Sequence, residues 1–542
     1  MLCEFARLRS RYSSMNTSLA VDNRSRPIIA FIAVTALIGM AWAAANWIVT
    51  GSLQALILGG MAIALIATIL ATLNDWRVGI LLFIPWLLFE DLPRKYLGNG
   101  LILFFGKDIL IAVTYISLWH AKRRNEISWL RTPFLLPLAL FFTLAFIQVF
   151  NTWTPSVLYG FLGLKLYFYY VPLLYAGYAL IGNAKDLERF LIYNVALGLL
   201  IASLGIVQSV VGLKFLNPAS LAPELETLGN LTRYSPLTHQ AVPQPTSVFV
   251  STGRFATYTI LLGILAFGME AYLLLKRPRQ AWYGLLGVGI TIVAAMQSGS
   301  RGAVIYLAIS MLVLSAGFFW GSPWQWTQHR PVMKAVRRSF LVGAVGLFTM
   351  IQFFPRSIGA SWAFYSETLS PTSSASELQN RTWDYPLRNL RAALEHPRWL
   401  YGDGTGTASL GMQYVAKVLG QPPIDFWVEN GWGTLILEMG ILGPILWIIW
   451  TFWLLWFAWK TVRRLRESVY FPLALSIFWY AFILLVPISY NGMAPYQNYV
   501  MNAYLWLLLG VLFRLPDLLR NEQVSMQALR LSQVSAAAVY AG

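Results

Sequence analysis

The feature that most constrains this chain is a series of apolar segments long enough to cross a membrane. A helix needs about 20 residues to span the hydrocarbon core of a bilayer. Segment 78–90 is short for this and 281–297 is marginal, so each is expected to be tilted, kinked or partly re-entrant. We predict an all-α polytopic membrane protein with about 12–14 transmembrane helices. The apolar segments lie at residues 28–49, 52–73, 78–90, 101–119, 133–150, 157–181, 190–213, 254–275, 281–297, 302–320, 338–355, 431–459, 471–490 and 498–514.

The composition supports an integral membrane protein. The 542-residue chain is 57% hydrophobic and only 12% charged, whereas soluble domains carry about 25% charged residues. The net charge of +17 therefore indicates a cytoplasmic collar facing anionic lipid rather than a nucleic-acid surface, and no nucleic-acid-binding module is visible. With Cys3 as the single cysteine, no disulfide can form within the chain.

The basic residues fix the expected orientation. Most of the 40 lysines and arginines fall in connections that an alternating topology assigns to the cytoplasm, as the positive-inside rule requires. Both termini are then cytoplasmic, and segment 28–49 is an uncleaved anchor. The predicted organisation is a basic N-terminus (1–27), an N-terminal transmembrane bundle (28–213), an extracytoplasmic loop (214–253), helices with an arginine site (254–355), a large extracytoplasmic loop (356–428), C-terminal transmembrane helices (429–514) and a cytoplasmic tail (515–542).

The two long outer loops differ in their expected structure. Loop 214–253 contains several prolines and is expected to be mostly irregular. In loop 356–428, the apolar spacing predicts an amphipathic helix over Asn380–Glu395. An insertion of this length between spans is usually functional.

Two arginines stand against the topological bias. Arg254 and Arg301 each lie at an outer membrane boundary, at the start of an apolar span. An arginine offers planar, bidentate donors suited to phosphate, and a helix N-terminus adds to the attraction for an anion. The alternative for each is a side chain that reaches the lipid headgroups. Two such arginines on consecutive outer boundaries favour an anion site.

The outer loop and the spans supply further candidates. Arg381 and Arg388 lie near one face of the expected helix, as substrate-binding residues or as a solvated, salt-bridged surface. Glu429 and Asn430 lie where the loop re-enters the membrane, where a carboxylate can act as a general base or simply begin a helix. Lys165 is an intramembrane charge, and such groups are usually functional and paired.

Other polar features were weighed without being assigned to the site. Lys107 and Asp108 are adjacent within a span and need not pair with each other. Glu90 and Asp91, adjacent in an outer loop, are expected to be solvated acids. The glycine-rich stretch 401–406 follows no strand, so we reject a nucleotide site there. No metal is implied.

Several short motifs resemble the O-antigen ligase/polymerase family of bacterial membrane glycosyltransferases, with features of its exopolysaccharide-polymerase branch. The resemblance covers roughly residues 160–510 and depends on the order of the motifs and on their outer placement. The motifs are Gly253-Arg254-Phe255, Ser298-Gly299-Ser300-Arg301-Gly302-Ala303, Arg381 through His396-Pro397 to Gly402-Asp403-Gly404, Glu429-Asn430 followed by Leu437-Glu438-Met439-Gly440, Gly163-Leu164-Lys165 through Pro172, and Lys107-Asp108.

The resemblance implies transfer of glycan repeat units from an undecaprenyl-diphosphate carrier to an acceptor hydroxyl at the outer leaflet of the bacterial cytoplasmic membrane. The reaction has no cofactor or metal, and the lipid-linked glycan is the substrate. Arg254 and Arg301 would hold the diphosphate. Relatives often carry His-Asn or His-Ser where this chain has Glu429-Asn430. Glu429 could replace the histidine as base, the base could be lost, or it could move to His239 or Asp384.

We therefore expect an O-antigen or exopolysaccharide polymerase or ligase, with polymerase favoured. Implied partners are the lipid-linked donor, a glycan or lipid-linked acceptor, membrane lipids, a flippase and a chain-length regulator. The alternative is a transporter of a solute such as the anion bicarbonate, against which the sequence shows neither repeat symmetry nor a paired charge at mid-depth. Arg254, Arg301 and Glu429 are expected to converge on one outer-facing cavity within about 10–12 Å, the span of a diphosphate-sized substrate.

Overall fold

The computed structural model is almost entirely helical. It describes residues 53–97, 101–130, 132–218, 231–278, 281–323 and 354–541, apart from 423, 425 and 427, and scattered residues between 337 and 352. The chain divides into two units between Asn74 and Asp75. In the first unit, the described residues form the apolar helix α3 (Leu53–Asn74). The predicted span 28–49 lies outside the described residues, and the span 338–355 lies largely outside them.

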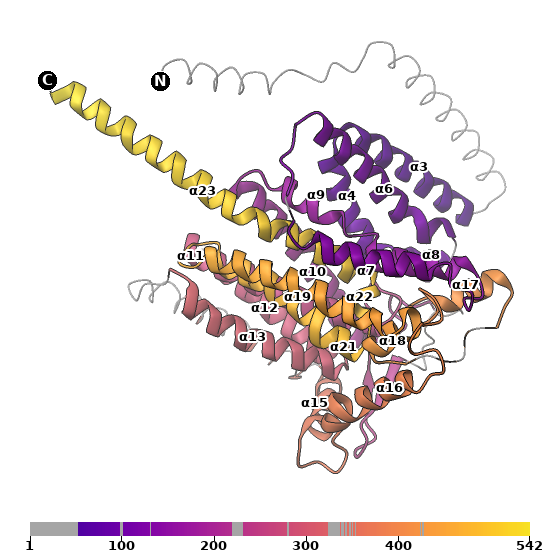
Figure 1. Ribbon diagram of the computed structural model, residues 1–542. Helices are drawn as coiled ribbons and strands as arrows, with labels where there is room; N and C mark the ends of the chain where they lie inside the picture. Colours follow the sequence, from indigo (N-terminus) through magenta and orange to yellow (C-terminus); the bar gives the residue numbers. More distant parts are fainter. Residues whose placement is uncertain are drawn as a thin grey trace. The chain divides into compact units, whose positions relative to one another are not determined.

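The second unit contains the other described elements (Figure 1). Two π-helical turns lie at Asn380–Asp384 and Leu484–Ile488. The helices and strands are α4 (Trp76–Phe89), α5 (Asp91–Leu97), α6 (Leu101–Arg123), α7 (Leu135–Gln148), α8 (Val157–Phe168), α9 (Leu173–Leu180), α10 (Ala184–Val211), β1 (Thr232–Tyr234), β2 (Ala241–Pro243), α11 (Thr252–Lys276), α12 (Ala281–Gln297), α13 (Arg301–Gly321), α15 (Pro355–Leu369), α16 (Tyr385–Leu394), α17 (Met412–Leu419), α18 (Gly431–Met439), α19 (Leu442–Arg464), α20 (Phe471–Ile483), α21 (Ser489–Asn491), α22 (Ala494–Gln497) and α23 (Tyr499–Ala541).

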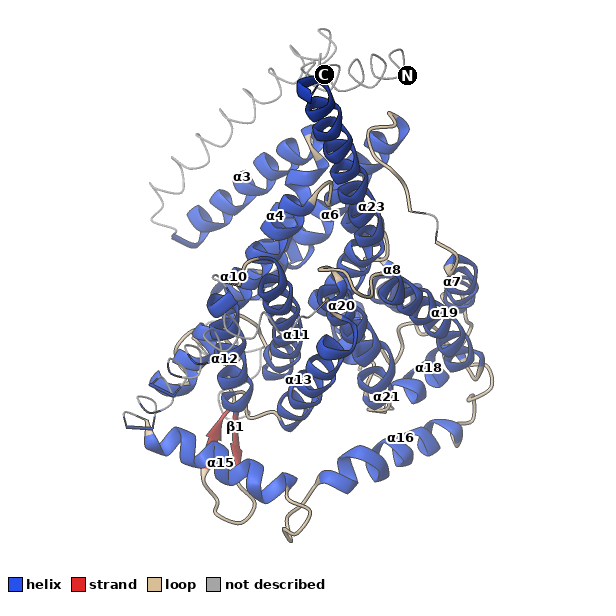
Figure 2. Cartoon of the chain, turned by 90° about the vertical axis from the view of Figure 1, so that its left-hand side faces the viewer, coloured by secondary structure: helices blue, strands red, loops and turns tan. Residues whose placement is uncertain are grey.

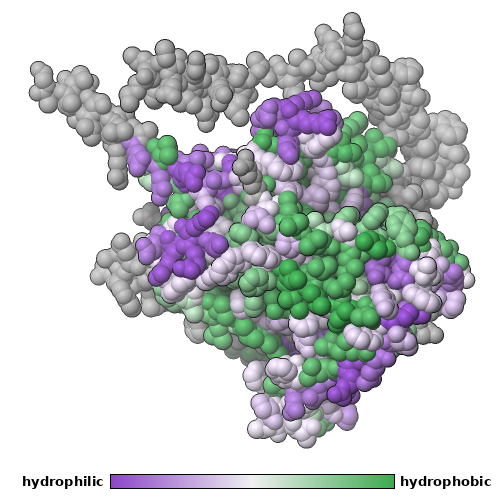
Figure 3. Space-filling view, in the orientation of Figure 1, coloured by the Kyte–Doolittle hydropathy of each residue, from purple (hydrophilic) through white to green (hydrophobic). Residues whose placement is uncertain are grey.

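The lengths and compositions of these helices make the chain an all-α polytopic membrane protein. Four shorter apolar helices accompany the long ones, at Ala62–Asn74, Trp76–Phe89, Leu135–Gln148 and Ala281–Gln297. On the face drawn in Figure 3, hydrophobic residues cover much of the middle, and hydrophilic ones gather at the end where α16 lies and at the opposite end. Within the described residues, seven segments are long and apolar enough to cross a membrane: Val157–Leu180, Ala184–Val211, Thr252–Lys276, Arg301–Gly321, Leu442–Arg464, Phe471–Asn491 and Tyr499–Gln527.

Three predicted spans differ from the observed helices. The span 157–181 is two helices, α8 and α9, separated by the turn residues 169–172. The span 431–459 is two helices, α18 and α19, because Gly440 at φ +69° interrupts the helical path. The span 498–514 is the first part of α23, which continues as helix to Ala541 through the predicted tail.

Close backbone contacts hold the centre of the second unit together. Helix α23 packs along α9, and α11 packs against α12 and α20. A Cβ atom added at Gly177 of α9 would lie 2.1 Å from the Leu507 carbonyl oxygen, and one at Gly510 would lie 2.2 Å from that of Leu174. Small residues at such crossings let helix backbones approach closely in membranes. The core therefore depends on glycines where α9 and α23 meet.

The segments within the two predicted long loops, 214–253 and 356–428, gather at one end of the second unit. Figure 2 shows the β-hairpin beside α15 and, further along, α16 beneath α18 and α21. The strands are antiparallel, with Arg233 opposite Val242, so part of a loop expected to be irregular is ordered. The amphipathic helix expected over Asn380–Glu395 is confirmed as the π-helical turn Asn380–Asp384 followed by α16.

Candidate functional site

The predicted site residues fall into two groups of charged side chains. We call the first group the buried charge network and the second the arginine cluster. The buried charge network consists of Lys165, Asp108, Lys107, Glu90, Arg94, Asp91 and Arg254. The arginine cluster consists of Arg233, Arg301, Glu377, Arg381 and Glu429.

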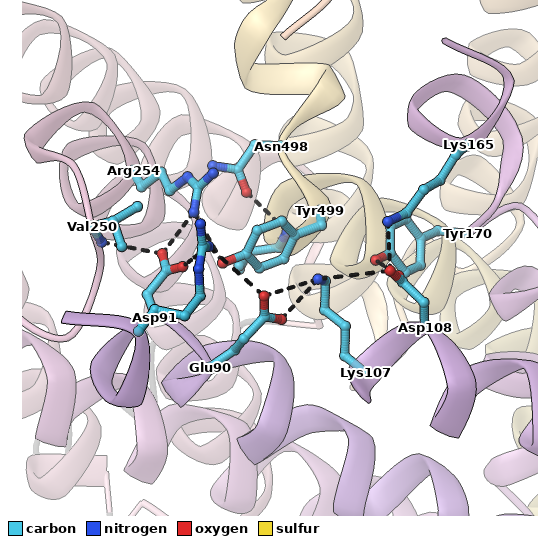
Figure 4. Close-up of polar contacts among 12 residues, drawn as sticks. Glu90, Asp91, Lys107, Asp108, Lys165, Tyr170, Val250, Arg254, Asn498 and Tyr499 are labelled. Carbon is cyan, nitrogen blue, oxygen red and sulfur yellow. Dashed lines mark hydrogen bonds and ion pairs between the residues drawn. The ribbon is translucent and has the colours of Figure 1, made fainter. Parts of the chain in front are cut away.

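The buried charge network alternates bases and acids across α4, α5, α6, α8 and α11 (Figure 4). At one end, Nζ of Lys165 lies 2.5 Å from Oδ2 of Asp108. Nζ of Lys107 lies 2.9 Å from the Glu90 carboxylate and 3.9 Å from that of Asp108. Lysine 107 thus links two acids, and Lys165 is paired, as expected for charges inside a membrane.

Asp91 is the acid at the other end of the network. Its carboxylate lies 2.6 Å from Nη1 of Arg94 and 2.7 Å from Nη1 of Arg254, and it accepts a hydrogen bond from the backbone N–H of Val250. Burial alone would raise the pKa of Asp91, but the charges of Arg254 and Arg94 lower it to about 2. Arg254 also donates to the Tyr499 hydroxyl at 3.0 Å. Asp91 is therefore a charged hub of the bundle.

The prediction that Glu90 and Asp91 are solvated acids is wrong. Both are buried, because Arg94 on the next helical turn and bases from distant segments neutralise them. The spacing of Arg94 at i+3 and i+4 was the signal available in the sequence. The buried Glu90–Lys107 and Asp108–Lys165 pairs also weaken one sequence argument against a transporter, which cited the lack of paired intramembrane charges.

The segment before α11 reaches both groups. Gln244 donates from Nε2 to the carbonyl of Gly299, two residues before Arg301. Six residues further on, the backbone N–H of Val250 donates a hydrogen bond to Oδ2 of Asp91 at 3.1 Å. This short stretch therefore runs from the surroundings of the arginine cluster to the buried charge network.

The arginine cluster brings together residues that are far apart in the sequence. Arg301 is the first residue of α13. Ser300 caps the N-terminus of this helix, because its hydroxyl oxygen accepts a hydrogen bond from the backbone N–H of Ala303. Nη1 of Arg301 lies 2.9 Å from Oε1 of Glu377, and Nε of Arg381 lies 3.4 Å from Oε2 of the same carboxylate. The hydrogen bond from Arg301 and its charge lower the pKa of Glu377. Glu377 is thus shared by two arginines.

Glu429 lies at the end of the same series of charges. Its carboxylate is 3.8 Å from Nη1 of Arg381, and its side chain is 44% exposed. Its backbone N–H donates to Oδ1 of Asn389 in α16, and α16 packs against α18. These contacts place an accessible carboxylate beside an arginine at the outer-loop end of the unit.

Asn430 and Arg388 have mainly local contacts. Asn430 is buried and caps α18 by accepting a hydrogen bond from Gly433 N–H at 2.8 Å. Arg388 is exposed, donates to Oδ1 of Asn380 at 3.1 Å and lies over the Tyr385 ring. The cap gives Asn430 a structural role at the start of α18.

The structure unites two of the three residues expected to converge. Arg301 and Glu429 belong to the arginine cluster, connected through Glu377 and Arg381, while Arg254 belongs to the buried charge network through Asp91. Sequence reasoning missed Glu377 and Arg233. The position of Arg233 in an outer loop, against the same topological bias as Arg301, was a signal that could have identified it.

The glycine-rich stretch 401–406 packs against the apolar helices. Thr405 donates from its hydroxyl to the carbonyl of Ala145 in α7. A Cβ atom at Gly406, where φ is +87°, would lie 1.8 Å from the Tyr159 carbonyl oxygen in α8. Nearby, the buried carboxylate of Glu438 accepts hydrogen bonds from the Ser409 and Tyr167 hydroxyls at 2.6 and 3.0 Å. The close approach at Gly406 lets the connection between α16 and α17 dock onto the apolar helices.

The remaining candidates for the base lie at exposed positions. His239 is at the turn of the β-hairpin with φ +53°, and Asp384 ends the π-helical turn before α16. Within the described residues, no group of three or more His, Cys, Asp or Glu side chains is arranged to hold a metal ion. Glu429 is the candidate base that lies within an arginine cluster.

Comparison of the chain with protein-family models and with curated proteins found no match.

Proposed function

We propose that this protein transfers glycan repeat units from an undecaprenyl-diphosphate carrier to an acceptor hydroxyl at the outer leaflet of a bacterial cytoplasmic membrane, as a polymerase or ligase. The observation that carries the proposal is the arginine cluster. In it, Arg301 and Arg381 contact the same carboxylate, that of Glu377, and Glu429 lies beside Arg381. The cluster lies next to apolar helices, where a lipid carrier would be accessible.

The chemistry requires a base and a way to stabilise a leaving group. Glu429 would accept the proton of the acceptor hydroxyl, whose oxygen attacks the anomeric carbon while the bond from that carbon to the diphosphate oxygen breaks. Direct displacement inverts the configuration. The charge that develops on the departing diphosphate would be neutralised by arginine guanidinium groups, which bind phosphate bidentately and need no metal.

The buried charge network gives Arg254 a different part in this proposal. Its guanidinium is held by Asp91 and Tyr499, so its main contribution would be to fix the start of α11. With its side chain 17% exposed, Arg254 keeps a surface from which it could also approach the carrier. Lys165 lies at the opposite end of the network, and its side chain is 20% exposed. It too could both hold the network together and approach the carrier.

The test is glycan assembly in a strain that lacks the native gene, complemented with wild type or single variants. The variants are Arg301→Ala, Arg254→Ala and Glu429→Gln, with Glu395→Gln as the control. Glu395 is an exposed carboxylate in the same loop. Membrane levels of each protein are measured, so that loss of the protein is separated from loss of activity.

The outcomes identify the reaction. Accumulation of lipid-linked single repeats in Arg301→Ala and Glu429→Gln would establish a polymerase. Lipid-linked long chains that fail to reach their acceptor would indicate a ligase. Normal glycan in all variants, at normal protein levels, would overturn the proposal and bring forward the transporter, which the buried ion pairs keep in contention.

A further inference from the structure

Arg233 is a third arginine beside Arg301 and Arg381. It lies in β1 directly opposite Val242 of β2, and side chains of directly opposed residues project from the same face of a sheet. Val242 is fully buried in a hydrophobic cluster with Ala360, Phe364 and Tyr365 of α15. The Arg233 side chain therefore starts on the hairpin face that packs on α15, and it remains exposed.

The same part of α15 borders Arg301. The guanidinium carbon of Arg301 lies 5.5 Å from the centre of the Phe364 ring. The hairpin itself is fastened to α15, because the Glu367 carboxylate accepts a hydrogen bond from the backbone N–H of Leu237 at 2.8 Å. The β-hairpin, α13 and α15 thus form one support for Arg233 and Arg301.

Positive charge is concentrated where the β-hairpin, α13 and α15 meet. Burial and the neighbouring charges of Arg301 and Arg381 lower the pKa of Arg233, and Glu377 only partly offsets them. Glu377 divides its two oxygens between Arg301 and Arg381, at 2.9 and 3.4 Å. Two guanidinium groups therefore share this carboxylate, and Arg233 adds a third positive charge whose pKa responds to both. Glu429 reaches only the Arg381 side, at 3.8 Å.

We propose that Arg233, Arg301 and Arg381 form one anion-binding site, that Glu377 occupies it in the free protein, and that a diphosphate displaces this carboxylate. A carboxylate that bridges two arginines mimics the geometry of a phosphate, which arginine forks also bind bidentately. A diphosphate brings more charge and more acceptor oxygens than one carboxylate, so it satisfies all three guanidinium groups. The choice of diphosphate as ligand rests on the proposed function.

Displacement of Glu377 has a consequence for the neighbouring carboxylate. Arg381 contacts both Glu377 and Glu429, so a ligand that draws Arg381 towards the cluster loosens its pairing with Glu429. The Glu429 carboxylate then becomes a freer proton acceptor when the diphosphate is in place. Binding of the donor would in this way prepare the base.

The experiment measures binding of inorganic pyrophosphate to the purified full-length protein in lipid nanodiscs by isothermal titration calorimetry. Arg233→Ala should weaken binding by roughly tenfold, the effect of losing one charge-assisted contact. Glu377→Gln should tighten binding several-fold because it removes the competing charge. Arg391→Ala is the matched control, since Arg391 is an exposed arginine of α16 in the same part of the chain, and it should bind as wild type does.

The thermal midpoint of each variant shows whether it is folded, and Arg233→Lys replaces Arg233→Ala if the latter does not fold. Lysine keeps the charge without the fork and should bind with intermediate affinity. Wild-type affinity in folded Arg233→Ala or Arg233→Lys, or weaker binding in folded Glu377→Gln, would overturn the site. Orthophosphate binding as tightly as pyrophosphate would overturn the assignment to a diphosphate.

Failure of this site is distinguishable from failure of the proposed function. Pyrophosphate affinity is measured without any glycan, whereas the proposed function is tested by glycan assembly in cells. Unchanged affinity in Arg233→Ala together with glycan loss in Arg301→Ala would overturn the three-arginine site and leave the transferase standing. The expected affinity changes together with normal glycan in Arg301→Ala would overturn the transferase and leave the anion site standing.

Discussion

Replacing Asp91 by asparagine removes the charge at the centre of the buried charge network. The Asp91 carboxylate is completely buried and neutralises Arg94 at 2.6 Å and Arg254 at 2.7 Å. Asparagine has nearly the same size but no charge, so two guanidinium groups lose their counter-ion. Removing one partner of a buried ion pair typically costs about 3–5 kcal/mol of folding free energy.

The pKa of Asp91 gives a second measure of the same interaction. Its decrease from 3.8 to about 2 corresponds to about 2.5 kcal/mol of preference for the charged form in the folded protein, at 1.36 kcal/mol for each unit. Because the Arg254 side chain is 17% exposed, water compensates part of its loss. We therefore expect Asp91→Asn to lower the free energy of unfolding by about 2–4 kcal/mol.

The pH dependence has a definite sign. A carboxyl group whose pKa is lower in the folded state contributes stability above its unfolded pKa, and that contribution is lost as the pH falls through the folded pKa. For Asp91 this window runs from about pH 4 down to about pH 2. The difference in stability between wild type and Asp91→Asn should be constant above this window and decrease within it.

The assay is denaturant unfolding of the detergent-solubilised protein, followed by tryptophan fluorescence. Glu126→Gln is the control, because Glu126 is 52% exposed and lies 4.0 Å from Arg124. Exposed ion pairs contribute less than about 1 kcal/mol. Equal losses of stability in the two variants, or no loss in Asp91→Asn, would refute the reasoning that burial makes this network structural.

Two further substitutions test how the outer loop is attached. Gly406→Ala should destabilise the protein by roughly 2–5 kcal/mol, because it adds left-handed backbone strain and overpacking. Gly420 has φ +64° but lies in open space, so Gly420→Ala should cost only about 1–2 kcal/mol of folding free energy. The thermal midpoints of the two variants should therefore differ clearly. Asn430→Ala removes the cap of α18 and should cost about 1 kcal/mol. Asn183→Ala, which removes the exposed cap of α10, should cost about the same, and a much larger loss at position 430 would mean that Asn430 does more than cap the helix.

The fold class was predictable because it depends on local composition. Runs of apolar residues and the helical spacing around 380–395 are short-range signals, and the structure contains the corresponding helices. The interruption at Gly440 was harder to foresee, because a single glycine within an apolar run is compatible with a continuous helix. Its φ of +69° allows Gly440 to lie against the Leu400 carbonyl, where an added Cβ would be 2.2 Å from the oxygen.

The grouping of charges was only partly predictable, because it depends on contacts between distant segments. Asp91 and Arg254 are 163 residues apart, and Lys165 and Asp108 are 57 apart. Adjacent acids in a predicted outer loop are most often solvated, and nothing in the local sequence reveals a base that arrives from another helix. Glu377 was overlooked for the same reason, since its two arginine partners come from α13 and from the π-helical turn before α16.

The two groups of charges lead to different expectations for residues that looked equivalent in the sequence. Arg254 and Arg301 both lie at the start of an apolar helix. Arg254 nevertheless faces a completely buried acid, whereas Arg301 faces a carboxylate that is 36% exposed. Separating a buried acid from its base leaves an unpaired charge without water, which costs a large desolvation free energy. An accessible acid can instead exchange its partner for water or for a ligand. Loss of Arg254 should therefore reduce the amount of folded protein, while loss of Arg301 should leave the protein folded and remove its anion site. Comparing membrane levels of Arg254→Ala and Arg301→Ala separates these roles, and equal levels with equal activity would contradict the division into a structural network and a ligand site.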